Sequence, residues 1–132
     1  RGFYNYDDRA RCVPASDDFT QGLQAEREAV GAPQFNWSSG QIQLRDLAAL
    51  LSAGCELTSR AAVSHPSEID VFAVASMGFP RWRGGPMKAA QAHGLVSMQL
   101  ASRKFQHDDE NIWSDSAVLS EAIKTAQGFD AL

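Results

Sequence analysis

A short segment rich in glycine, proline and aromatic residues, residues 77–87, constrains the fold of this chain more than any other. Its glycines can adopt backbone angles that other residues rarely adopt. Its prolines fix φ and lack a backbone donor, and Pro86 suits the first position of a helix, where no donor is needed. Phe79 and Trp82 are large apolar rings that we expect to pack against the fold. We therefore predict a structural turn between two helices, formed by Gly78, Phe79, Pro80, Trp82, Gly84, Gly85 and Pro86.

The longest helix is expected at residues 38–62. Its apolar residues recur at three- and four-residue spacings, as in Leu44, Leu47 and Leu51. Gly54 lies inside this helix, where a glycine is destabilising by roughly 1 kcal/mol relative to alanine. Two interpretations remain open: the glycine is merely tolerated, or it permits close approach of a second helix.

The remaining pattern is also helical. Ser67, with Asp70 three residues later, resembles a capping box at the start of a helix. The spacing of Leu95, Met98, Ala101 and Phe105 predicts another apolar helical stripe. No long alternation of period two is present, so we predict an all-α fold in which no strand is needed. The predicted organisation is an extended arm with one helix, residues 1–37, and a helical bundle, residues 38–132, with helices at 17–30, 68–77, 86–94, 95–106 and 115–127.

Composition excludes several classes of function. The net charge is −4 and the sequence pI is about 5.2, which argues against a nucleic-acid partner or an anionic membrane surface. No apolar run approaches the roughly 18–20 residues needed to span a bilayer. Cys12 and Cys55 are the only cysteines, too few for a disulfide framework, so a reducing compartment is expected.

No arrangement of residues predicts a catalytic, cofactor-binding or metal site. His65, His93 and His107 are scattered along the chain without the spacing of metal ligands. There is no nucleophile elbow and no phosphate loop. One basic cluster, formed by Arg81, Arg83 and Lys88, permits two interpretations. It contacts an anion such as a CoA phosphate, or it is solvated and pairs with nearby acids to hold the turn.

The turn segment carries a family resemblance. Its motif resembles the second C-terminal repeat of L-3-hydroxyacyl-CoA dehydrogenases, and most closely the multifunctional β-oxidation enzymes that fuse an enoyl-CoA hydratase to such a dehydrogenase. The sequence departs from the family pattern at Ala89 and Gln91, and at residues 52–54 and 76–78. The matching elements, in order, are Gly2-Phe3-Tyr4-Asn5-Tyr6, Glu68-Ile69-Asp70-Val71, Gly78-Phe79-Pro80, Arg83-Gly84-Gly85-Pro86-Met87, and Trp113 with Leu119 and Phe129.

The resemblance implies a function for a larger parent enzyme. It implies a fold like the C-terminal domain of 6-phosphogluconate-dehydrogenase-like proteins, in a parent that oxidises (3S)-3-hydroxyacyl-CoA to 3-ketoacyl-CoA with NAD. In this family the Rossmann domain and the first C-terminal repeat carry the NAD site and the catalytic residues. We therefore expect those two parts as partners, and expect this chain, beginning at Arg1 without Met, to be a C-terminal fragment that binds no cofactor and is inactive alone. A bacterial cytoplasm is the expected location, with the peroxisome as the alternative.

Other functions remain open. The chain could be a stand-alone helical interaction module that uses Phe79 and Trp82, or a CoA-binding module that uses Arg81 and Arg83. A homodimer is a further expectation. Its surface would be the stripe of Leu44, Leu47, Leu51 and Gly54, unless that stripe is internal to the bundle.

Overall fold

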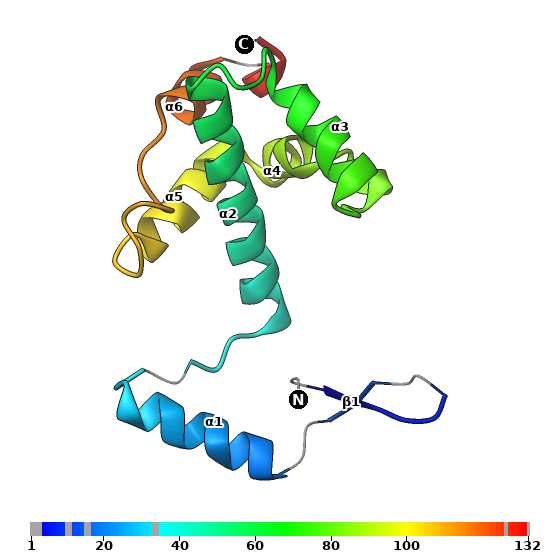
Figure 1. Cartoon of the computed structure of the whole chain (residues 1–132). Helices are drawn as coiled ribbons and strands as arrows, with labels where there is room; N and C mark the ends of the chain where they lie inside the picture. Colours follow the sequence, from blue (N-terminus) through cyan, green and yellow to red (C-terminus); the bar gives the residue numbers. More distant parts are fainter. Residues whose placement is uncertain (1–3, 10–11, 15–16, 33–34, 126, 132) are drawn as a thin grey trace. The chain divides into compact units, whose positions relative to one another are not determined.

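Two structural units make up the chain, Arg1–Asn36 and Trp37–Leu132, and each is described by itself. The computed structural model describes residues 4–9, 12–14, 17–32, 35–125 and 127–131 (Figure 1). Of the family-like elements, Gly2 and Phe3 lie outside these residues.

The first unit contains a short hairpin followed by one helix. Strand β1 (Tyr4–Tyr6) pairs antiparallel with β2 (Cys12–Pro14), and Asn5 lies opposite Val13. Helix α1 (Asp17–Ala29) begins with two acidic residues, which suit the positive end of the helix dipole, and buries none of its residues. The expectation that no strand is needed is therefore wrong for the arm, because its extended backbone pairs with itself.

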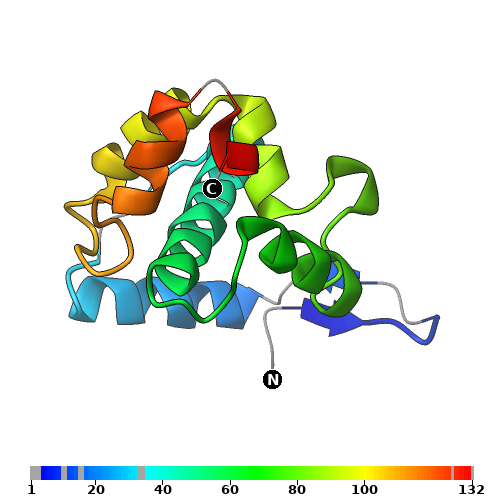
Figure 2. The ribbon, with the colours of Figure 1, turned by 90° about the horizontal axis from the view of Figure 1, so that it is seen from above.

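The second unit contains helices joined by turns and no strand among its described residues, which confirms the predicted all-α class. Helix α2 (Ser39–Ser59) runs through its middle, with α5 (Leu95–Phe105) and α6 (Ala117–Lys124) on one side and α3 (Pro66–Ser76) on the other (Figures 1 and 2). Helix α4 (Pro86–His93) packs against α2, α3 and α5. Two short 3-10 turns, η1 (Arg81–Arg83) and η2 (Gly128–Ala131), complete the unit.

The core of this unit forms around α2. The predicted stripe on α5 (Leu95, Met98, Ala101 and Phe105) is buried, as are the C-terminal residues Trp113, Leu119 and Phe129. The Arg45 guanidinium lies 4.6 Å from the ring centre of Phe105 and 5.2 Å from that of Trp113, and it donates to the Asp108 carboxylate at 2.6 Å. Arg45 thus makes an ion pair with Asp108 and cation–π contacts with two aromatic residues of the core.

Gly54 permits close packing of two helices. A Cβ atom built on Gly54 would lie 2.4 Å from the Met87 sulfur on α4, so the second of the two interpretations holds. Leu47, Leu51 and Gly54 are all buried inside the unit. The stripe is therefore internal, and its assignment as a dimer surface is wrong.

Several predicted helix ends are also wrong. Helix α2 ends at Ser59 because Ala61 adopts a positive φ of 52°, which stops the helix. Helix α3 is capped by the His65 imidazole, whose Nδ1 accepts from the Ser67 N–H, rather than by Ser67. Helix α6 begins after Ser116, whose hydroxyl accepts from the Leu119 N–H, and it ends at Lys124.

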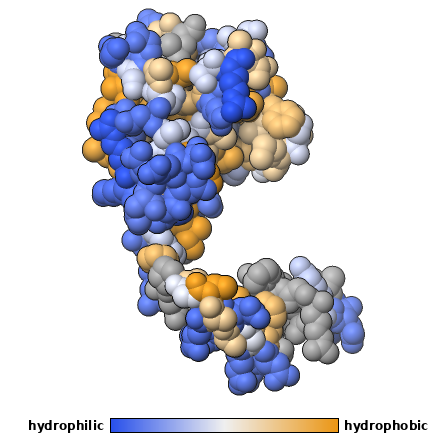
Figure 3. Space-filling model, turned by 60° about the vertical axis from the view of Figure 1, so that its left-hand side comes forward, coloured by the Kyte–Doolittle hydropathy of each residue, from blue (hydrophilic) through white to orange (hydrophobic). Residues whose placement is uncertain are grey.

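The surface mixes polar and apolar side chains. Hydrophilic residues and hydrophobic residues both reach the face of the helical unit seen in Figure 3. Among the exposed apolar side chains are Val71, Phe72 and Met77 near α3. Across the described ranges, no helix is both long enough and apolar enough to cross a membrane.

Candidate functional site

Asp70 of α3 caps the N-terminus of α4. Its carboxylate accepts from the Met87 N–H at 2.7 Å and from the Lys88 N–H at 3.2 Å. Gly85, the residue that precedes α4, has no side chain to serve as a cap, and Asp70 supplies the missing acceptor from another helix. This cross-helix hydrogen bonding fixes α3 against α4.

Gly85 is required beside this carboxylate. Its φ is +113°, a conformation that residues with a side chain rarely adopt. A Cβ at this position would lie 2.4 Å from the Asp70 Cβ and 2.5 Å from the Asp70 Cα. The backbone of the turn therefore approaches α3 as closely as only glycine allows.

The environment of Asp70 raises the pKa of its carboxyl. Burial raises the pKa of the Asp70 carboxyl above its ordinary value of 3.8, while the N–H donors of Met87 and Lys88 and the Lys88 charge oppose this shift. The side chain is only 9% exposed. Both N–H donors at the start of α4 point at this carboxyl, so we interpret Asp70 as a helix cap.

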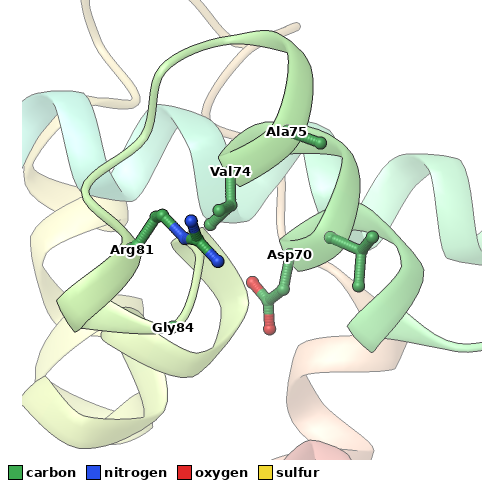
Figure 4. Close-up of a pocket in the computed structure, with 6 residues that line it drawn as sticks. Asp70, Val74, Ala75, Arg81 and Gly84 are labelled. Atoms are coloured by element: carbon green, nitrogen blue, oxygen red, sulfur yellow. The ribbon is translucent and has the colours of Figure 1, made fainter.

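A groove of about 600 Å³ lies between α3 and η1 (Figure 4). The Arg81 guanidinium projects from η1 into this groove, across from Val74 and Asp70 on α3. Its other lining residues are Val71, Ala75 and Gly84. The groove thus places the Arg81 guanidinium across from a helix face that carries three apolar side chains and the Asp70 carboxylate.

Trp82 does not pack as expected. Its ring is 87% exposed, so its prediction as a packing residue is wrong, whereas Phe79 is half-buried against the core. Residues 81–83 form a single 3-10 turn, which ends at Gly84 with a left-handed φ of 79°. So short a turn buries none of its residues, and it holds the indole out in solvent.

The basic cluster divides into two parts. The Lys88 ammonium pairs with the Asp130 carboxylate at 3.1 Å, so the acid-pairing interpretation holds for Lys88. In the described part of the chain, no ion pair involves Arg81 or Arg83. The Arg83 guanidinium lies 5.9 Å from the ring centres of both Phe79 and Trp82. Within the part of the chain that the structure describes, the acid-pairing interpretation therefore does not hold for Arg81 and Arg83.

A C-terminal hydrogen-bond network was missed by the sequence reasoning. The Gln91 side-chain oxygen accepts from the Phe129 N–H at 2.9 Å, and its amide nitrogen donates to Asp130 at 3.3 Å. Hydrogen bonds from Lys88 and then Gln91 lower the pKa of Asp130. The departure from the family pattern at Gln91 was the available signal, but nothing in the sequence identified its distant partners.

The three histidines have separate environments. His65 caps α3, His93 is exposed at the end of α4, and the His107 Nε2 lies 2.8 Å from the Asp108 carboxylate. Among the described residues, no three His, Cys, Asp or Glu side chains are placed so that they could hold a metal ion. The three histidines therefore do not form a common site among the described residues.

Several known proteins are similar in sequence to this chain. It is 33% identical over 108 residues to the peroxisomal bifunctional enzyme of Danio rerio, and 29% identical over 108 residues to the fatty acid oxidation complex subunit alpha of Psychrobacter sp. (strain PRwf-1). The matches cover 81% and 80% of this chain but only 15% of either relative. No protein-family model matches the chain. The two relatives confirm the predicted resemblance to multifunctional fatty-acid oxidation enzymes.

Proposed function

We propose that this chain is a structural part of a multifunctional fatty-acid β-oxidation enzyme, and that it carries no catalytic residue of its own. The parent would oxidise (3S)-3-hydroxyacyl-CoA to 3-ketoacyl-CoA with NAD. In that parent a histidine of another domain would take the hydroxyl proton while hydride passes to the nicotinamide. The chain would contribute a helical domain of the 6-phosphogluconate-dehydrogenase C-terminal type.

One observation carries this proposal. The motif that resembles the dehydrogenase family is used to build the joint between α3 and α4, where Asp70 accepts from Met87 and Lys88 and Gly85 packs against Asp70. Further family-like residues, Trp113, Leu119 and Phe129, lie in the core. Residues that are committed to packing and capping stabilise a domain, and their chemistry is not available to a substrate.

The proposed partners are other parts of the parent polypeptide. Val71, Phe72 and Met77 are each at least 60% exposed, which is unusual for neighbouring large apolar side chains. The Rossmann domain and the preceding repeat are proposed to cover such surface. The cytoplasm of a bacterium is the proposed location, and the peroxisome is the alternative.

Binding of the dinucleotide cofactor tests the proposal. Titration calorimetry of this chain with NADH should give no saturable heat, because the proposed NAD site lies in the Rossmann domain. The same titration with a complete 3-hydroxyacyl-CoA dehydrogenase is the positive control. Saturable NADH binding by this chain would place the cofactor site here and contradict the proposal.

A stand-alone interaction module is the second candidate function. The exposure of Trp82 and Phe72 favours it, since an interaction surface often contains exposed aromatic rings. A homodimer would use the same surface. Sedimentation equilibrium of the chain and of Phe72→Ser over a wide concentration range tests this candidate. Self-association that Phe72→Ser abolishes would support it, and a monomer at every concentration would exclude the homodimer.

A further inference from the structure

The middle of the chain is basic although the whole chain is acidic. Residues 71–107 contain five of the twelve Lys and Arg residues and no Asp or Glu, while the net charge of the chain is −4. Within this stretch, Lys88 is paired with Asp130 and Arg103 with Asp115. Arg83 has no such carboxylate partner among the described residues. This part of the surface is therefore suited to an anionic ligand.

Trp82 offers an aromatic face beside that cation. Its ring is 87% exposed, and the Arg83 guanidinium lies 5.9 Å from the ring centre. The turn that presents both residues is held by hydrogen bonds from the Arg83 N–H to the Pro80 carbonyl and from the Gly84 N–H to the Arg81 carbonyl. The backbone that carries both residues is thus held in one conformation, which lowers the entropic cost of binding.

A hollow of about 360 Å³ extends from these residues towards α4. Trp82 and Arg83 line one part of it, and His93, at the end of α4, lines another. The remaining lining residues are Ala89 and Ala92, whose small side chains leave the space open. The hollow therefore combines an aromatic ring, a guanidinium and an imidazole around an unfilled volume.

We propose that the hollow formed by Trp82, Arg83, Ala89, Ala92 and His93 binds a nucleotide that carries a terminal phosphate monoester. The base stacks on the exposed indole, since every base has a π face that an aromatic side chain can meet. The phosphate accepts charge-assisted hydrogen bonds from the Arg83 guanidinium, with the His93 imidazole as a further donor. The natural ligand would be the 3′-phosphoadenosine end of coenzyme A. Only this choice of ligand rests on the proposed function.

Coenzyme A and dephospho-coenzyme A test the phosphate requirement directly. They differ only in the 3′-phosphate, and this comparison needs no variant. Titration of the ¹⁵N-labelled chain with coenzyme A should move the indole N–H signal of Trp82 saturably. The chain has three tryptophans, and the signal that disappears in Trp82→Phe identifies the right one. Dephospho-coenzyme A should give no saturable shift over the same concentration range, because it lacks the phosphate that meets Arg83 and His93.

Two variants test the residues. Trp82→Ala and Arg83→Gln should each weaken coenzyme A binding by about tenfold, through lost stacking and a lost charged hydrogen bond. Trp82→Phe should retain most of the affinity, because it keeps an aromatic face. Lys104→Gln is the matched control, since it removes one exposed positive charge from the same acid-free stretch and should leave the affinity unchanged. Urea melts establish that each variant is folded.

Four results would overturn the inference, and the fourth concerns adenosine 3′,5′-bisphosphate. One is the absence of any saturable shift with coenzyme A at millimolar concentration. Another is equal affinity for coenzyme A and dephospho-coenzyme A, and the third is equal weakening by Arg83→Gln and Lys104→Gln. Adenosine 3′,5′-bisphosphate separates a general nucleotide site from one that also needs the pantetheine arm: binding equal to that of coenzyme A supports the inference, and no binding contradicts it. NADH carries no phosphate monoester, so the hollow should not hold it, and the coenzyme A titration and the NADH titration test the two proposals separately.

Discussion

The carboxylate of Asp70 on α3 accepts a 2.7 Å hydrogen bond from the backbone N–H of Met87 on α4. One side chain thereby satisfies a donor at the start of a helix that is seventeen residues further along the chain. Gly85 lies against Asp70, and its missing Cβ leaves room for the Asp70 side chain. The joint between α3 and α4 depends on this pair.

Loss of the Asp70 carboxylate should destabilise the chain. Asp70→Ala leaves the N–H groups of Met87 and Lys88 without an acceptor and should lower the free energy of unfolding by about 3 kcal/mol. Asp70→Asn keeps one acceptor oxygen and should lower it by less. Urea denaturation measures both. Asp46→Ala, at an exposed position of α2, is the control and should change stability by less than about 0.5 kcal/mol.

Two glycines of the turn should differ sharply in their tolerance of alanine. At Gly85 a Cβ would collide with the Asp70 backbone and side chain, so Gly85→Ala should cost at least about 3 kcal/mol. Gly78 also has a positive φ, of 73°, but has open space around it, so Gly78→Ala should cost only about 1–2 kcal/mol. Equal losses in urea melts would mean that backbone strain, and not contact with Asp70, makes Gly85 necessary.

Two tryptophans should respond in opposite ways to truncation. Trp82 is almost fully exposed, so Trp82→Ala should change the free energy of unfolding by less than about 0.5 kcal/mol. Trp113 is buried beside Phe105, and Trp113→Ala should cost about 3–5 kcal/mol. Thermal or urea unfolding distinguishes them. A large loss for Trp82→Ala would mean that its ring packs against the protein in solution.

The Cys55 thiol should make stability fall at high pH. Burial raises the pKa of the Cys55 thiol from 9.0 to about 11, with Ser116 opposing. The folded state therefore keeps a proton that the unfolded state loses between these values, and stability falls as the pH rises through that interval. The slope should be steeper in Cys12→Ser, which retains Cys55, than in Cys12→Ser/Cys55→Ala. Identical slopes would show that the thiol titrates alike in both states.

Local signals in the sequence were enough to place most helices. Pro86 and the glycines identified the turn, and the apolar spacing of Leu95, Met98, Ala101 and Phe105 identified the buried face of α5. These features depend on residues a few positions apart, which a single sequence displays directly. The internal position of the Leu47 and Leu51 stripe could not be decided in this way, because burial depends on which other helices surround α2.

The candidate site was harder to predict because its contacts are distant in sequence. Asp70 looked like the third residue of a local capping box, whereas it caps another helix, and His65 takes the local role. Trp82 looked like a packing residue because large rings are usually buried, but a three-residue turn buries none of its side chains. Sequence pattern gives residue types and spacing, and it does not give the direction in which a turn presents them.

Turnover by the isolated chain is the most direct test of its structural role. The measurement is NADH oxidation with acetoacetyl-CoA as substrate, at a high concentration of the chain, with a complete 3-hydroxyacyl-CoA dehydrogenase as positive control. The account predicts a rate equal to that of the buffer blank, because Asp70, Gly85 and Met87 build a helix joint and the proposed catalytic residues belong to other domains. Turnover that scales with the concentration of the chain and is lost on unfolding in urea would contradict it.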